Sequence, residues 1–242
     1  MNAAATILAA DLEVGHHHQA VVGGLTFNVD TIWSSVVAGV IVLGAAIYMA
    51  NRATSGRPSK LQLAFETIVD AVEKQVKSSM GDVAPFVVPL AVVLFMYILI
   101  ANWLELLPTG GYLEAPSGDI NFTLALGLLV VVWVHVVHIK QKGLRKYLAH
   151  YKHGVPVIAP VLNAIEELVK PFTLALRLFG NIFAGGVMLA IIGLFPSYLL
   201  WLPNAAWKYV DFFVAVIQAF IFALLTILYF GFALEPEEET AH

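Results

Sequence analysis

Apolar residues are concentrated in five long runs along the chain. The runs cover about residues 32–50, 84–107, 120–139, 156–195 and 204–234. A helix needs about 20 mostly apolar residues to cross the hydrocarbon core of a bilayer, so each run is long enough to span a membrane. The pattern predicts an all-α integral membrane protein with about five membrane helices.

The last two runs are longer than one membrane crossing requires. As helices, residues 156–195 would measure about 60 Å and residues 204–234 about 46 Å. The hydrocarbon core is only about 30 Å thick. We therefore expect both helices to be strongly tilted, kinked or broken. Proline and glycine residues supply places to bend, at Pro171, Gly180, Gly185 and Gly186.

Residues 59–80 have a different pattern, in which apolar and charged side chains alternate with helical spacing. The apolar positions are Leu61, Leu63, Phe65, Ile68, Val69, Val72 and Val76. Most of these positions fall on one helical face, which predicts an amphipathic helix at the membrane interface. A soluble helix between two spans would have the same pattern, and the sequence leaves both interpretations open.

The basic residues predict how the chain is oriented in the membrane. Ten of the 13 Lys and Arg residues lie in two connections, at residues 52–77 and 140–152. The positive-inside rule places both connections in the cytoplasm. Five spans then predict an outside N-terminal segment at residues 1–30, one membrane domain at residues 31–235 and an acidic cytoplasmic tail at residues 236–242.

The composition agrees with a membrane protein and narrows the chemistry. Residues are 60% hydrophobic and 12% charged, against about 25% charged in soluble domains. The chain has no cysteine, which excludes disulfides and cysteine–metal sites. We interpret the histidines at residues 16–18 as a solvated segment, and His135 and His138 lack a third metal ligand. We expect no metal, no cofactor and no nucleic-acid partner.

Arg177 is the polar residue that is hardest to reconcile with a membrane helix, because apolar residues flank it on both sides. A guanidinium stays charged at any biological pH. At the centre of a membrane helix such a charge costs at least about 2.5–3.5 kcal/mol on insertion scales. The expected helix ends are too far away for Arg177 to reach the surface. The residue therefore needs an anion, a water-filled cavity or both.

Five further polar residues lie between the outer ends of the runs and the depth of Arg177. They are Asn102, Glu105, Asn181, Asp211 and Gln218. Asn102 and Glu105 are three residues apart on one helical face. Gln218 lies seven residues, or about 10 Å, deeper than Asp211. These residues predict a polar path from the outer surface to Arg177. For Asn102 and Gln218 taken singly, contacts between helices are an equally good explanation.

Two acidic residues and several small residues also lie on the run that contains Arg177. Glu166 and Lys170 have the i, i+4 spacing of an ion pair, whereas Glu167 is a candidate for a cytoplasmic exit path. Small residues near Arg177 predict the close approach of another helix. They are Gly180, Ala184 and Gly185, with Gly186 next to them.

Three segments of the chain resemble subunit a of F-type ATP synthase, the stator of its proton channel. Leu-Ala-Leu-Arg-Leu-Phe-Gly-Asn at residues 174–181 is similar to the family's signature. Asn-Trp-Leu-Glu-Leu-Leu-Pro at residues 102–108 resembles its Asn-x-x-acid-Leu-Leu-Pro motif. Gln-Ala-Phe-Ile-Phe at residues 218–222 resembles the start of its C-terminal motif. The motifs occur in the family's order, and the similarity covers residues 30–235.

The resemblance implies a set of partners and a location. The family's subunit faces a rotating ring of c subunits, each of which carries a carboxylate in the membrane. Protons enter by one half-channel, travel on the ring and leave by the other half-channel. We accordingly expect a c-subunit ring, b-type peripheral stalk subunits, the remaining ATP synthase subunits and membrane lipid as partners. The expected location is the bacterial plasma membrane, and the chain is expected to carry out no bond chemistry itself.

The resemblance also implies roles for residues that match the family's motifs. Arg177 would be the essential stator arginine, supported by Asn181 and Gln218, while Asn102 and Glu105 would belong to the outer half-channel. Gly180, Ala184, Gly185 and Gly186 would face the ring.

The chain departs from the bacterial pattern at two positions. That pattern often has Glu where this chain has Gly186, and His where it has Asp211. The acid has moved from one helix to the facing one. We therefore expect Asp211 to be the proton carrier of the outer half-channel.

Two other functions fit a membrane chain with a buried arginine. In an ion-coupled secondary transporter, Arg177 would bind an anionic substrate. Such a protein is expected to contain internal repeats, and none is visible in the sequence. In a structural scaffold, the polar residues would only join helices. Replacement of Arg177 separates these readings, because a scaffold tolerates it better than a channel does.

Overall fold

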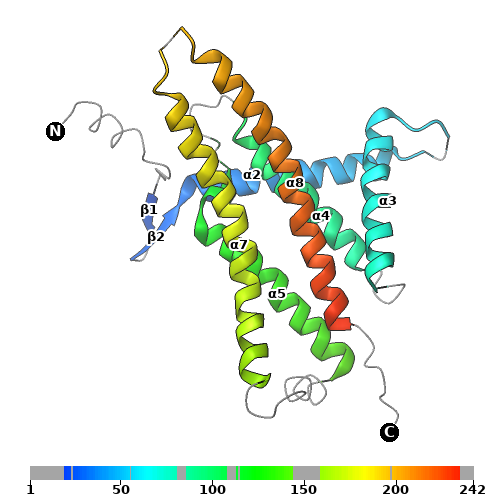
Figure 1. The fold of residues 1–242 in the computed structure, drawn as a ribbon. Helices are drawn as coiled ribbons and strands as arrows, with labels where there is room; N and C mark the ends of the chain where they lie inside the picture. Colours follow the sequence, from blue (N-terminus) through cyan, green and yellow to red (C-terminus); the bar gives the residue numbers. More distant parts are fainter. Residues whose placement is uncertain are drawn as a thin grey trace. The chain divides into compact units, whose positions relative to one another are not determined.

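The computed structural model describes residues 19–22, 24–54, 56–80, 86–107, 113, 115–143, 159–196 and 198–234. A hairpin of two strands, β1 (Gln19–Val22) and β2 (Leu25–Asn28), precedes the helices. The α-helices are α2 (Val29–Arg52), α3 (Lys60–Met80), α4 (Val87–Leu104), α5 (Ile120–Lys142), α7 (Ala159–Ile192) and α8 (Trp201–Leu234). A short 3-10 helix, η1 (Pro116–Gly118), precedes α5. Figure 1 shows these elements along the chain.

Among the residues that the structure describes, five helices are long and apolar enough to cross a membrane. They are α2, α4, α5, α8 and the part of α7 from Val169 to Ile192. The prediction of an all-α membrane protein with five spans is therefore confirmed. The helix ends lie within a few residues of the expected ones. The small differences arise because hydropathy locates a span better than it locates the residues that cap it.

Helices α7 and α8 are both long and continuous (Figure 1). Each has 34 residues, which corresponds to about 50 Å at the usual helical rise. Both helices are long, as expected, although α7 is shorter than the apolar run at residues 156–195, and it continues unbroken through Pro171, Gly180 and Gly185. A proline is tolerated inside a membrane helix where neighbouring groups satisfy the backbone it frees.

Helix α3 confirms the amphipathic helix predicted for residues 59–80. Ser59 caps this helix, because the backbone amide of Gln62 donates to the Ser59 hydroxyl oxygen over 3.2 Å. On its exposed side, Lys77 forms an ion pair with Glu73 at 2.7 Å. This pair holds the pKa of Glu73 below its usual range, first through the hydrogen bond from Lys77 and then through its charge. The location of α3 at a membrane interface stays a prediction.

The hairpin of β1 and β2 was not predicted from the N-terminal sequence. Its strands pair antiparallel, from Gln19 with Asn28 to Val22 with Leu25. Gly24 in the turn has a φ of 85°, a left-handed conformation that favours glycine. Strand β2 ends at Asn28 and α2 begins at the next residue, so the hairpin is attached directly to the first membrane helix.

The chain forms two compact units, and most membrane helices contribute to both. The first unit contains Met1–Ala45, Met96–Leu124 and Ala175–Ala219. Its apolar core includes Ala38 of α2 packed with Ala101 and Leu104 of α4. The two alanines allow these helices to approach closely.

The second unit contains Ala46–Phe95, Ala125–Leu174 and Phe220–His242. In this unit α5 and α7 touch through their backbones at Gly127. A Cβ atom at Gly127 would lie 2.8 Å from the carbonyl oxygen of Pro171. The ring of Phe86 also packs edge-to-face on Phe230 of α8, with centroids 5.7 Å apart.

Candidate functional site

Arg177 lies on the exposed face of α7 in the first unit, far from both helix ends. The nearer end, Ile192, is roughly 22 Å away along the helix axis. Its neighbours Ala175 and Leu178 are fully buried, so a different face of α7 packs into the unit. In the described part of the chain, no hydrogen bond or ion pair joins Arg177 to another residue.

The small residues beside Arg177 divide between two faces of α7. Gly180 and Ala184 share the exposed face with Arg177, and an added Cβ at Gly180 would meet no atom within 4 Å. Gly185 is buried and Gly186 is half-buried, and whether these two glycines face the ring stays a prediction. The exposed face around Arg177 therefore carries small side chains, and no atom of the described residues lies within 4 Å of an added Cβ at Gly180.

Asp211 of α8 lies against Gly185 of α7. A Cβ atom at Gly185 would lie 3.5 Å from one carboxylate oxygen of Asp211 and 3.6 Å from the other. These are ordinary van der Waals distances, so the carboxyl group of Asp211 lies next to Gly185. Residue 185 is eight positions from Arg177, roughly 12 Å along the helix. Asp211 is too far along the axis to be the direct ion-pair partner of Arg177.

The predicted outer end of α4 reaches α8 beside Asp211. The indole of Trp103 stacks on the ring of Phe212, with centroids 4.7 Å apart and planes inclined by 10°. Its Nε1 also donates to the Phe212 carbonyl oxygen over 3.4 Å. Trp103 is next to Asn102 in the chain and Phe212 is next to Asp211, so this contact brings the two predicted polar segments together. Sequence reasoning missed both aromatic residues.

Asn102 is buried, with 4% exposure, and only one of its two polar side-chain atoms has a hydrogen-bond partner among the described residues. Its Oδ1 accepts a hydrogen bond from the Ser117 hydroxyl. Its Nδ2 is buried and has no hydrogen-bond partner among the described residues. Glu105 is half-buried in the turn after α4, which ends at Leu104.

Gln218 and Asn181 complete the set of predicted polar residues on α7 and α8. Gln218 is 6% exposed, and its Nε2 is a second buried donor without an acceptor in the described chain. Asn181 is half-buried, one turn from Arg177 on α7. Because buried polar groups are nearly always hydrogen-bonded, the two free amide donors call for water or another partner.

Asp119 is a buried carboxylate that sequence reasoning missed. It is 6% exposed and accepts hydrogen bonds from Asn28 Nδ2 (2.6 Å) and Thr31 Oγ1 (3.2 Å). It also accepts from the Asn121 backbone amide at 2.8 Å, as an N-cap does at the start of α5. An Asp just before an apolar run is a capping signal, and it was available in the sequence.

Asp119 joins the hairpin, α2 and α5 at one point of the first unit. Ser117, two residues earlier, bonds to Asn102. The Asp119 carboxylate therefore anchors the loop that carries Ser117, whose hydroxyl donates to Asn102. Two further buried polar residues at this end of the unit are Asp30 and Ser34 of α2.

The remaining candidates lie in the second unit or outside the described residues. Glu166 and Glu167 belong to α7, but their side chains lie outside the described residues, as does the histidine segment at residues 16–18. Lys170 lies 5.7 Å from the centre of the Tyr229 ring, a cation–π contact. Among the described residues, no group of three His, Asp or Glu side chains is placed to hold a metal ion.

The chain is similar to known proteins along nearly its whole length. The family model of the ATP synthase A chain matches residues 32–231. ATP synthase subunit a of Acidothermus cellulolyticus is 54% identical over 94% of this chain and 84% of its own length. The subunit a of Mycobacterium bovis is 49% identical over 97% of this chain and 98% of its own. The subunit a of Vibrio cholerae is 34% identical over 87% of this chain and 86% of its own length. With five membrane helices and this match, the chain is a multi-pass membrane protein that belongs to the ATP synthase A chain family.

Proposed function

We propose that this membrane-sector subunit of ATP synthase is the stator that conducts protons to and from a rotating ring of c subunits. In this proposal Arg177 is the central countercharge between two aqueous half-channels. One observation carries it: a permanent cation is exposed at the middle of a membrane helix and has no partner in the described chain. A charge in that position needs an anion, water or both from outside the described chain, and a partner anion gives the larger stabilisation.

A carboxylate on the ring is the anion that fits this position. When a ring carboxylate has lost its proton, it is an anion in lipid, and pairing with Arg177 lowers its free energy. Arginine does not titrate, so it cannot pass a proton from one half-channel to the other. Arg177 would thereby stabilise the ionised carboxylate and also block a proton short circuit. The low surface at Gly180 and Ala184 leaves room for a ring helix to approach.

The outer half-channel is proposed to pass Asn102, Asp211 and Gln218. The unpaired amide donors of Asn102 and Gln218 support it, because water in a channel would supply their acceptors. Asp211 is the titratable group between them, and Glu105 lies beside the entrance. From Gly185 to Arg177 is roughly 12 Å along α7, and from Asp211 to Gln218 about 10 Å along α8. Gln218 and Arg177 would therefore lie at similar depth.

The cytoplasmic half-channel is proposed to use Glu166 and Glu167, and this part rests on the sequence alone. The proposed partners are the c-subunit ring and b-type stalk subunits, and the proposed location is the bacterial plasma membrane. The N-terminus would lie outside and the C-terminus in the cytoplasm, as the basic connections predict. Membership of the ATP synthase A chain family leaves no observation in favour of a secondary transporter or a scaffold.

Replacement of Arg177 tests the central assignment. Arg177→Ala or Arg177→Gln should abolish proton-driven ATP synthesis in inverted vesicles while the complex still assembles. Arg177→Lys should also fail largely, because an ammonium lacks the planar fork of a guanidinium and can lose its proton when buried. Leu176→Ala, at an exposed apolar neighbour on the same helix, is the control and should keep synthesis. Near-normal synthesis by Arg177→Ala would overturn the proposal.

A further inference from the structure

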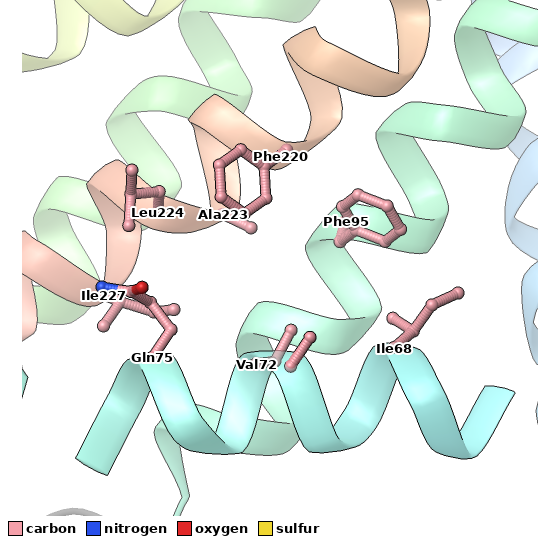
Figure 2. Close-up of a pocket in the computed structure, with 9 residues that line it drawn as sticks. Ile68, Val72, Gln75, Phe95, Phe220, Ala223, Leu224 and Ile227 are labelled. Carbon is pink, nitrogen blue, oxygen red and sulfur yellow. The ribbon is translucent and has the colours of Figure 1, made fainter. Parts of the chain in front are cut away.

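The second unit contains an apolar cavity that is lined by α3, α4 and α8 and open on one side. Figure 2 shows side chains of these three helices around it. Its volume is about 100 Å³. Eight of its nine lining residues are apolar, and Gln75 is the exception. An engineered apolar cavity of about 150 Å³ stays free of water and takes up benzene, so a space of this kind favours an apolar occupant.

The one polar side chain at the cavity does not require water. The Gln75 side-chain amide donates to the hydroxyl oxygen of Ser79 on the same helix, over 3.3 Å. The other contributions of α3 are Ile68, Ala71 and Val72, the apolar face of the amphipathic helix (Figure 2). Helix α3 therefore covers the cavity with its apolar side and keeps its Glu73–Lys77 ion pair on the exposed side.

The cavity reaches the surface of the unit. Phe220 of α8 lines it and is 52% exposed, and Ala71 of α3 also lines it and is exposed. Val93 of α4, beside the lining residue Phe95, is another exposed apolar side chain. We infer that the exposed apolar surface of the spanning helices α4 and α8 at this mouth is in contact with the hydrocarbon phase. The mouth of the cavity is continuous with that surface.

We propose that this cavity binds the end of an acyl chain of a membrane phospholipid. An acyl chain is unbranched, enters a small cavity end-on, and is the main component of the phase outside the mouth. Each buried methylene group contributes favourably without needing a hydrogen bond. The bound chain would connect α3 to α4 and α8 and so act as a structural lipid. This site is independent of the proposed proton path, because no charged residue takes part in it.

Labelling of the whole ATP synthase complex in its native membrane tests the site. The probe is a phospholipid with a photoactivatable diazirine at the end of one acyl chain, and mass spectrometry locates the label. In the unmodified complex the label should concentrate on the cavity residues of α3 and α8. Ala223→Phe fills the cavity from α8, and Ala71→Phe fills it from its exposed edge. Excluding about two methylene groups should lower this labelling about tenfold.

Matched variants make the result decisive. Leu63→Phe adds a ring to an exposed position of α3 that does not line the cavity, and should leave labelling unchanged. If the Ala223→Phe complex does not assemble, Ala71→Phe still tests the site. Residue 71 is exposed, so a larger side chain there is tolerated more easily than one at a buried position. Unchanged labelling in an assembled Ala71→Phe complex would overturn the proposal, as would label spread evenly over exposed α3 residues. Arg177→Ala should not alter labelling, which separates this site from the proton path.

Discussion

Asp211 illustrates how a single residue depends on a neighbour from another helix. Its carboxyl group contacts the position where a side chain at Gly185 would begin. Residue 186, where the related pattern often has an acid, is a half-buried glycine. In the proposed outer half-channel one titratable group is needed at this depth, and we propose Asp211 for that role. Asp211 of α8 is thus positioned next to α7 at Gly185.

Asp211→Asn should slow proton flux while the complex still assembles. The amide keeps the size and polarity of the carboxyl group but has no exchangeable acidic proton, so flux should fall roughly tenfold or more. The measurement is passive proton uptake by vesicles that contain the membrane sector alone. Asp211→Glu is the control, because it keeps a titratable group on α8.

Two outcomes would change the assignment of the relay. Flux at the normal rate in Asp211→Asn would make Asp211 structural and transfer the role to Glu105. The double change Gly186→Glu with Asp211→His would restore the commoner arrangement and should recover part of the flux lost in the single variant. Failure of that double variant to assemble would show a clash at residue 186.

At the scale of elements, the contact of α5 with α7 depends on one glycine. A Cβ atom at Gly127 would lie 2.8 Å from the carbonyl oxygen of Pro171 and 3.5 Å from its Cα. Backbone atoms cannot rotate away as a flexible side chain does, so any larger residue must push the two helices apart.

Gly127→Val should destabilise the membrane sector. Overpacking of a tight contact costs about 1–3 kcal/mol, and Gly127→Ala should cost less than Gly127→Val. The measurement is the temperature at which the solubilised complex loses subunit a. Gly44→Ala is the control: an added Cβ at Gly44 meets no atom within 4 Å, so this change should be neutral. Equal thermal stability of Gly127→Val and Gly44→Ala would mean that the contact is not tight.

At the scale of the whole molecule, the orientation of the five spans can be tested with introduced cysteines. The chain has no native cysteine, so there is no background labelling. Cysteines at Ser59 or Gln141, both exposed, should react with an impermeant maleimide only from the cytoplasmic side. A cysteine at Tyr198, which is 78% exposed, should react from outside. Labelling of position 141 from outside would reverse the proposed topology.

Much of the architecture could be predicted because it depends on local sequence. Membrane spans follow from stretches of apolar residues, and the helix α3 from the spacing of apolar and charged side chains. Arg177 could be singled out because a permanent charge in an apolar run has a high free-energy cost wherever its neighbours lie. The hairpin of β1 and β2 was missed because its strands have only four residues each, too short for a clear alternation.

The contacts that shape the candidate site could not be read from the sequence. Asp211 meets Gly185, Trp103 stacks on Phe212, and Asn28 donates to Asp119 across 91 positions of the chain. Periodicity and hydropathy describe one segment at a time, so they do not specify which side chains of different helices meet. The sequence by itself determined the spans, the charge at position 177 and the family. The tertiary structure alone decided that Arg177 is exposed without a partner in the described chain, because burial depends on how separate helices pack.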